Sequence, residues 1–153
     1  MKYLVLALLL LPLSAKADNV EIACLALNIY HEARSEPLEG QRAVAAVTLN
    51  RVQHSRFPNT VCEVVKQARY KNGRLVKHQC QFSWWCDGKS DKPKEKETFY
   101  RIWRLAEQMY ETYRDNTGGA LFYHADYVNP WWAQHKSKTT KIGRHVFYRY
   151  KAP

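Results

Sequence analysis

Two carboxyl groups near the end of an apolar helical pattern, Glu32 and Glu36, are the side chains best suited to proton transfer. Glu32 follows Leu25 by seven positions and therefore lies at the margin of an apolar helix face. A carboxyl group at such a margin is partly removed from water, which raises its pKa. An acid that keeps its proton near neutral pH can donate it to a glycosidic oxygen. From periodicity alone, the commoner alternative is a solvated surface acid paired with Arg34 or a lysine.

The helix that carries Glu32 is predicted from Asp18 to residue 34 or 35. Its apolar positions recur at helical spacing: Ile22, Leu25, Ala26, Ile29 and Ala33. Asp18 and Glu21 have the spacing of a capping box, in which the first side chain accepts a free backbone amide and the second reaches back. Pro37 disfavours helix at the residue before it and suits the first turn of a following helix, so Glu36 falls beyond the first helix.

Two further helices are predicted after Pro37. An apolar stripe marks the first of them: Ala43, Val44, Ala46 and Val47. Asn50 falls within this stripe and needs either a hydrogen-bond partner or a cavity, and the sequence leaves both open. Thr60 and Glu63 repeat the capping-box spacing and predict a short helix.

The second half of the chain changes character twice. Residues 70–91 are predicted to be irregular, and residues 89–97 to form an exposed connection. A helix is predicted over Thr98–Arg114, with an inward face: Phe99, Ile102, Trp103, Ala106, Met109, Tyr110 and Tyr113. Residues 116–119 end it, and the later segments "ALFYH" and "HVFYRY" favour short strands. No repeat and no domain boundary is found, so one domain is expected.

Aromatic side chains are frequent in the predicted loops and at the strand margins: Trp84, Trp85, Trp131, Trp132, Tyr123 and Tyr127. Loop aromatics often line concave sites and stack on flat ligand faces. Filling the core of a small domain is the alternative, and it is expected for at least half of them.

An export leader is predicted over residues 1–17, with Lys2 before an apolar run and a small-residue cleavage site at its end. An uncleaved anchor is the alternative, although the apolar run is short for a bilayer and contains Pro12. Cleavage leaves residues 18–153 as a single domain. The formal charge then falls from +10 to +8, because Lys2 and Lys16 leave with the leader.

Export gives meaning to the four cysteines, Cys24, Cys62, Cys80 and Cys86, which predict two disulfides. Three pairings remain open. The spacing of Cys80 and Cys86 is wider than a structural zinc site favours. The positive charge attracts polyanions such as nucleic acid, anionic lipid or bacterial wall polymers, with an ordinary solvated surface as the alternative.

Five segments in consistent order, spanning residues 21–150, resemble the SleB-type cell wall hydrolases, the family of spore-cortex-lytic enzymes. They are "IYHEARSEPLEGQRAVAAVTLNRV", "FPNTVCEVV", "QFSWWCDG", "ALFYHADYVNPWW" and "IGRHVFYR". The resemblance implies an α+β, mainly helical fold: a lysozyme-like compact domain with a small antiparallel β-sheet. It also implies cleavage of the bond between N-acetylmuramic acid and N-acetylglucosamine in peptidoglycan.

By the same resemblance the catalytic acid is Glu32, the first glutamate of the "EARxE" segment, and Glu36 is the fallback. Residues expected to face the substrate are Gln81, Phe82, Ser83, Tyr123, His124, Asn129 and His145. The resemblance favours a lytic transglycosylase, in which the sugar's own 6-hydroxyl closes a 1,6-anhydro ring without external water. A hydrolytic muramidase with a second carboxylate, Asp87 or Asp126, is the alternative.

Two other classes of protein are alternatives to a peptidoglycan glycosidase. A zinc amidase would use His124, His135 and His145, although the chain has no HExxH motif. A non-enzymatic module would bind wall polymer or nucleic acid through charge and tryptophans. We expect an exported monomer, periplasmic or extracellular, that binds peptidoglycan glycan strands and uses no metal or cofactor. It is expected to bind no nucleic acid and not to stay inserted in a membrane after leader cleavage.

Overall fold

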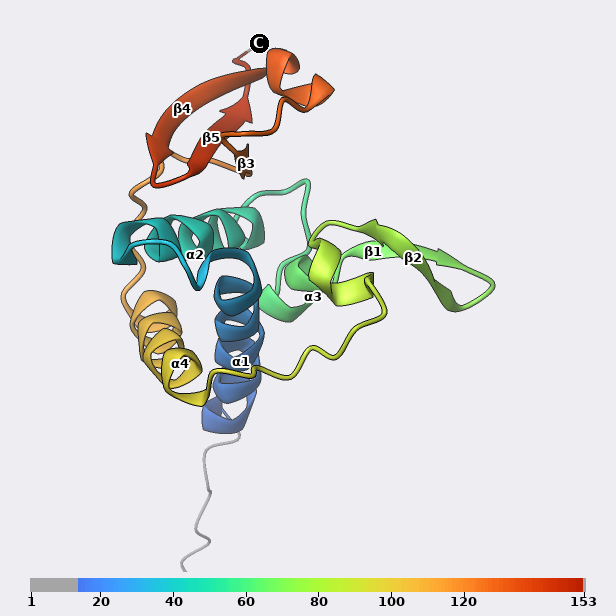
Figure 1. Ribbon diagram of the computed structural model, residues 1–153, viewed down its shortest axis with the longest axis vertical. Helices are drawn as coiled ribbons and strands as arrows, with labels where there is room; N and C mark the ends of the chain where they lie inside the picture. Colours follow the sequence, from blue (N-terminus) through green and yellow to red (C-terminus); the bar gives the residue numbers. More distant parts are fainter. Residues whose placement is uncertain (1–13, 153) are drawn as a thin grey trace, which may run out of the picture.

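The helices form a bundle around a central first helix. The computed structural model describes residues 14–152, and Figure 1 shows its helices in the lower part of the molecule. They are α1 (Ser14–Ala33), α2 (Leu38–Val52), α3 (Val61–Val65) and α4 (Lys96–Glu111). Helix α1 packs against each of the other three. No helix within residues 14–152 is long and apolar enough to cross a membrane.

The start of α1 differs from the prediction. The helix already runs through residues 14–17, so Asp18 is inside it rather than at its cap. Glu21 does not reach back; its Oε2 accepts hydrogen bonds from the backbone amides of Val61 at 2.5 Å and Cys62 at 3.2 Å. The acid instead satisfies free amides at the beginning of α3, where a negative charge is favoured. The predicted leader falls mostly outside the described residues.

The other predicted helix signals are confirmed. Thr60 caps α3 by accepting a hydrogen bond from the backbone amide of Glu63. Pro37 marks the start of α2 as expected, although it is the capping residue before Leu38 rather than part of the first turn. Helix α4 begins two residues earlier than predicted and ends three residues earlier, while Ile102, Ala106 and Met109 are buried as expected.

The core lies between α1 and its three neighbours. Its largest fully buried apolar side chains include Leu25 and Ile29 of α1, Val64 of α3 and Ile102 of α4. A disulfide between Cys24 and Cys62 joins α1 to α3, and a second joins Cys80 to Cys86. Two disulfides were expected, and the structure selects one of the three pairings.

A two-stranded hairpin occupies part of the segment that was predicted to be irregular. Strand β1 (Ala68–Lys71) pairs antiparallel with β2 (Arg74–Cys80), and a one-turn 3-10 helix (Ser83–Cys86) follows. The irregular prediction was wrong because neither strand has a buried face, so apolar alternation is missing. The signal that remains is the Asn72–Gly73 turn, where both residues have positive φ, a strong local hairpin indicator.

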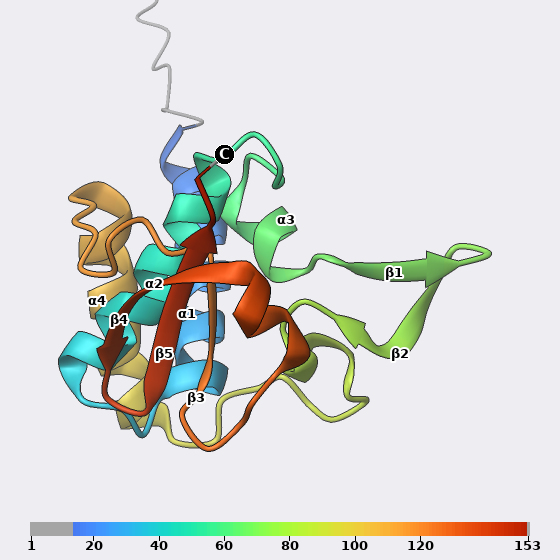
Figure 2. The ribbon, with the colours of Figure 1, turned by 90° about the horizontal axis from the view of Figure 1, so that it is seen from above.

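A three-stranded antiparallel sheet, of order β3-β5-β4, covers the outer side of α2 (Figure 2). Its strands are β3 (Phe122–Ala125), β4 (Lys136–Ile142) and β5 (His145–Tyr150), with a 3-10 helix (Trp131–His135) before β4. The inner face rests on α2 through Phe147, which packs against Ala43 and Val47. The aromatic segments predicted β3 and β5. Strand β4 was missed because "KSKTTKI" is largely polar.

Candidate active site

Glu32 lies in the last turn of α1, on the side of the helix that faces strand β3 of the sheet. Tyr123 of β3 donates its hydroxyl to Glu32 Oε2 at 3.0 Å, a contact between residues 91 positions apart. Tyr123 points inward because it lies opposite Phe147 in the β3–β5 register and shares the face that packs on α2. Glu32 is half-buried, so it is partly shielded by protein and still reachable from outside.

The surroundings of Glu32 favour its protonated form. Burial raises the pKa of the Glu32 carboxyl, while the Tyr123 hydrogen bond and the positive charge of Arg51 lower it by less. Removal from water is thus the largest effect, as expected for an acid at the edge of a core. Burial, followed by the neighbouring Glu32, raises the pKa of Tyr123 well above its ordinary value, so its hydroxyl stays a hydrogen-bond donor.

Arg51 supplies the positive charge that acts on Glu32, and it was not predicted from the sequence. It is 4% exposed, at the end of α2, and its Nε donates to the carbonyl oxygen of Leu121 at 2.8 Å. Its guanidinium carbon lies 5.1 Å from the ring centre of Phe57 and 5.2 Å from that of Phe82. Burial lowers the pKa of Arg51, and Tyr123 and then Glu32 oppose that effect. One Nη atom is buried without a hydrogen-bond partner among the described residues.

A buried hydrogen-bond network fixes α1, α2 and the Ser83–Cys86 turn to one another. Asn28 donates to Thr48 Oγ1 at 3.1 Å, and Trp84 Nε1 donates to Asn28 Oδ1 at 3.0 Å. The same Trp84 stacks on the ring of His31, with ring centres 4.5 Å apart. Asn28 lies one helical turn before Glu32, and Thr48 lies nearly one turn before Arg51. Polar residues three or four apart in both apolar helices were the signal that would have revealed this face.

His145 packs beside the Tyr123 ring, edge to face, with ring centres 5.1 Å apart. It is 8% exposed, and its Nδ1 has no hydrogen-bond partner among the described residues. Burial lowers the pKa of His145, while Glu36 and Asp126 oppose this. Burial therefore favours a neutral imidazole packed beside the Tyr123 ring.

The structure brings some of the predicted site residues together and separates others. Phe82 is buried beneath Arg51, whereas its neighbours Gln81 and Ser83 are exposed. His124 lies on the outer face of the sheet, where its ring nitrogens contact the Tyr148 hydroxyl at 2.9 Å and the Ala125 carbonyl at 2.8 Å.

Asn129 is exposed in the loop after β3. Of the loop tryptophans, Trp84 belongs to the core and Trp131 is exposed. The substrate-facing roles of the polar residues in this set stay predictions.

Glu36 and Asn50 are used structurally. Glu36 Oε2 accepts the backbone amide of Arg144 at 2.9 Å and so ties the α1–α2 corner to the β4–β5 turn. Asn50 donates to the carbonyl oxygen of Ala120 at 2.9 Å and accepts a hydrogen bond from the Tyr113 hydroxyl. The polar residue in the α2 stripe is therefore a satisfied asparagine rather than one facing a cavity.

A pocket of about 340 Å³ opens beside the end of α1. Its walls include Tyr30, His31 and Arg34 of the helix, together with Asp87 and most of residues 89–95, which connect the Ser83–Cys86 turn to α4. Glu32 itself is not among the lining residues, although it directly follows His31.

The histidines of the zinc alternative do not gather. His124 and His145 lie on opposite faces of the sheet, and within residues 14–152 no three His, Cys, Asp or Glu residues are grouped as metal ligands.

The chain is similar to known cell wall enzymes in both sequence and structure. Residues 35–148 match the family described as Cell Wall Hydrolase. The spore cortex-lytic enzyme of Oceanobacillus iheyensis is 32% identical over 135 residues, which covers 83% of this chain and 41% of that protein. The Bacillus cereus enzyme of the same description is 33% identical over 128 residues, covering 83% of this chain and 43% of its own. The chain thus spans about two fifths of the length of these curated relatives.

Two solved structures are similar over nearly the whole chain. The catalytic domain of the germination-specific lytic transglycosylase SleB from Bacillus anthracis is 31% identical, with a TM-score of 0.63. That comparison covers 91% of this chain and all of the domain. The catalytic domain of Bacillus cereus SleB is 32% identical with a TM-score of 0.58, covering 87% of this chain and 91% of the domain. The family match begins at residue 35, so it does not itself include Glu32.

Proposed function

The chain belongs to the Cell Wall Hydrolase family, and we propose that it cleaves the β-1,4 bond between N-acetylmuramic acid and N-acetylglucosamine in peptidoglycan, with Glu32 as the acid. The observation that carries this proposal is the environment of Glu32: half-buried, with a raised pKa, and held by Tyr123 at 3.0 Å. The likeness to the catalytic domain of a lytic transglycosylase supports the choice of reaction.

The mechanism uses one carboxyl group twice. Tyr123 occupies Oε2 of Glu32, which leaves Oε1 free to carry the transferable proton. Glu32 gives this proton to the bridging oxygen as the bond from that oxygen to the muramic acid C1 breaks. The resulting carboxylate then takes the proton of the muramic acid 6-hydroxyl. At the same time, the 6-oxygen of the sugar forms a bond to C1 of the same sugar. The products are a free 4-hydroxyl and a 1,6-anhydro sugar, and no water is consumed.

Arg51 and Tyr123 have a defined part in this cycle. Both favour the carboxylate of Glu32, so they stabilise the charge that appears when the proton leaves. Burial favours the acid before the reaction, and these two groups limit how far its pKa rises. Because the arginine is already fixed by Leu121 and its aromatic neighbours, no rearrangement is needed as the charge develops.

The hydrolytic alternative needs a second carboxylate, and both candidates are engaged elsewhere. Asp126 binds Lys141 at 2.9 Å, and this partner holds the pKa of Asp126 below its ordinary value. Asp87 accepts the backbone amide of Lys89 at 2.7 Å. A carboxylate with such a partner can still act as a base, so the support for the one-acid mechanism is the likeness to the catalytic domain of a lytic transglycosylase.

Product analysis tests the proposal. Purified sacculi digested with the protein should release fragments that end in 1,6-anhydro-muramic acid, identified by mass spectrometry. Glu32→Gln should lower turnover by about 10²–10⁴-fold, the usual contribution of a general acid, with the fold retained in circular dichroism. Reducing muramic acid ends in place of the anhydro form would reject the transglycosylase, and full activity of the variant would reject Glu32 as the acid.

The proposal includes export of a monomer to the periplasm or the medium after removal of residues 1–17. Cleavage there would remove the first four residues of α1 and leave Glu21, with its contacts to α3, in place. N-terminal sequencing of the mature protein should begin at Asp18; any start inside the folded helix beyond Glu21 would contradict the boundary.

A further inference from the structure

Positively charged side chains are concentrated on the hairpin of β1 and β2 and immediately before it. Residues 64–86 contain five lysines and arginines and no aspartate or glutamate, although the chain has 14 acidic residues in all. The five are Lys66, Arg69, Lys71, Arg74 and Lys77. All of them are exposed. We call the segment Ala68–Cys80 the basic hairpin.

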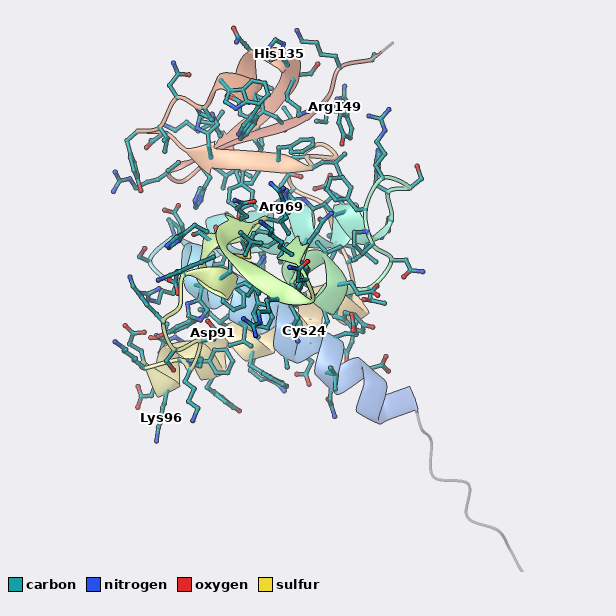
Figure 3. All side chains as sticks on the ribbon, turned by 90° about the vertical axis from the view of Figure 1, so that its right-hand side faces the viewer. Cys24, Arg69, Asp91, Lys96, His135 and Arg149 are labelled. Carbon is teal, nitrogen blue, oxygen red and sulfur yellow. A yellow bond between two sulfur atoms is a disulfide. The ribbon has the colours of Figure 1, made fainter. Side chains whose placement is uncertain are left out.

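The basic hairpin stands apart from the rest of the molecule. Figures 1 and 2 show it extending away from the helices and from the sheet, and Figure 3 looks toward it, with Arg69 labelled. Lys71 and Arg74 lie directly opposite each other in the strand register, so their side chains share one face. The register shifts between Ala68 and Tyr70, so Arg69 lies at an irregularity of the strand beside this pair. The opposite face presents Tyr70, which is paired with Leu75.

No acid neutralises this face. None of the ion pairs formed within residues 14–152 involves a residue of the basic hairpin. Arg69 donates to the neutral Gln79 at 3.3 Å, and Lys66, next to the hairpin, lies over the ring of Trp85. Like charges directly across a strand pair destabilise it, so the arrangement has a cost that local structure does not offset.

Protection of exposed strand edges is the simplest other reason for these charges. Lysine on an edge strand discourages pairing with another chain, but either sign of charge serves that purpose. Edge protection therefore explains charge. It does not explain why Lys71 and Arg74 carry the same sign, since opposite charges facing each other would protect the edges and also stabilise the pair. A fixed sign indicates a partner of the opposite sign.

We propose that the basic hairpin binds the carboxylates of the peptide stems of peptidoglycan and so holds the glycan strand near Glu32. This inference rests on the proposed function, because it takes the partner to be the same polymer. The base of the hairpin is fixed to the site: Cys80 is bonded to Cys86, and Trp84 between them is hydrogen-bonded to Asn28 of α1. The base of the hairpin is therefore attached to α1 through Asn28, one helical turn before Glu32.

Sedimentation with intact sacculi tests the hairpin. The Glu32→Gln chain is used so that the polymer is not digested, and Lys71→Glu with Arg74→Glu is added to it. The exchange keeps a like-charged pair across the strands and keeps charged edges, so hairpin stability and edge protection change little. Binding at low salt should weaken by about tenfold, since two exposed attractions become repulsions. The difference should vanish at high salt.

A matched control carries Lys96→Glu and Arg101→Glu, which change the net charge equally on the exposed face of α4. Figure 3 shows Lys96 well separated from Arg69. This control should bind sacculi as the parent does, and sacculi whose carboxyl groups have been converted to amides should bind the parent no better than the hairpin variant. Equal loss in both charge variants, or undiminished binding to amidated sacculi, would overturn the proposal.

Binding to vesicles of phosphatidylglycerol tests whether the hairpin instead recognises the phosphate groups of lipids. Hairpin-dependent binding to vesicles that matches or exceeds binding to sacculi would assign the surface to lipid phosphate and reject wall carboxylates. The proposed function is tested separately by the anhydro products of the active chain. If the active chain yields anhydro products but binding does not depend on the hairpin charges, only this inference is rejected. If binding depends on the hairpin charges but the active chain shows no turnover, only the proposed function is rejected.

Discussion

Removal of the Tyr123 hydroxyl is the sharpest test of how the acid is controlled. Tyr123→Phe deletes the 3.0 Å hydrogen bond to Glu32 Oε2 and leaves the ring in its packing with His145 and Phe147. A hydrogen bond to a charged group contributes about 1.5–3 kcal/mol. If about half of the carboxylate charge has developed in the transition state, about 1 kcal/mol is lost, and kcat/KM falls about fivefold.

The pH profile separates this role from a merely structural one. The reaction requires protonated Glu32, so the alkaline limb of kcat/KM reports the pKa of that acid. Because the Tyr123 hydrogen bond lowers the pKa of Glu32, its removal should move the alkaline limb to higher pH. Release of soluble muropeptides from sacculi, measured across the pH range for both proteins, gives the two profiles.

Tyr148→Phe is the matched control. It removes a tyrosine hydroxyl from the outer face of the same sheet, where the hydroxyl contacts His124 at 2.9 Å and does not touch Glu32. Its alkaline limb should coincide with that of the unmodified protein. An alkaline limb that stays in place in Tyr123→Phe, or that moves to lower pH, would refute the assignment of Tyr123 as the group that tunes the acid.

Two further outcomes are expected from the contacts of the remaining acid and of the disulfides. Glu36→Gln should keep turnover within about twofold, because an amide oxygen can still accept the backbone amide of the β4–β5 turn; a loss as large as that of Glu32→Gln would identify Glu36 as the acid. Replacing Cys24 and Cys62 by alanine, at a separation of 38 residues, should lower the free energy of unfolding by about 4 kcal/mol. The Cys80 and Cys86 pair, at a separation of 6, should cost about 2 kcal/mol, and urea denaturation that ranks the two pairs in the opposite order would contradict this estimate.

The helices and the acid at the margin of an apolar face were predictable because their signals are local. Helical periodicity, Pro37 and the Thr60 cap each act over a few residues, and the structure retains them. The basic hairpin was missed because it buries neither face, so strand alternation never appears in its sequence. Glu21 was predicted to cap its own helix, whereas it caps α3. The prediction failed because the two amides that donate to Glu21 lie 40 and 41 residues further along the chain.

The partners of Glu32 could not be derived from local pattern. Tyr123 reaches it from 91 residues away, and only the pairing of β3 with β5 decides that this side chain faces inward. Arg51 reads in the sequence as an ordinary charged residue at a helix end. Three phenylalanines surround and bury it: Phe57, Phe82 and Phe122. They come from three separate segments of the chain.

The acidity of Glu32 is therefore a property of the assembled domain rather than of α1. The helix alone would leave the carboxyl at a solvated margin, where its pKa would be ordinary. Packing of β3 brings Tyr123 to the acid, and Phe57, Phe82 and Phe122 enclose Arg51, so several segments together supply the two groups that stabilise the anion of Glu32. A chain in which these segments are not yet packed therefore holds a solvated glutamate, whose pKa burial has not raised.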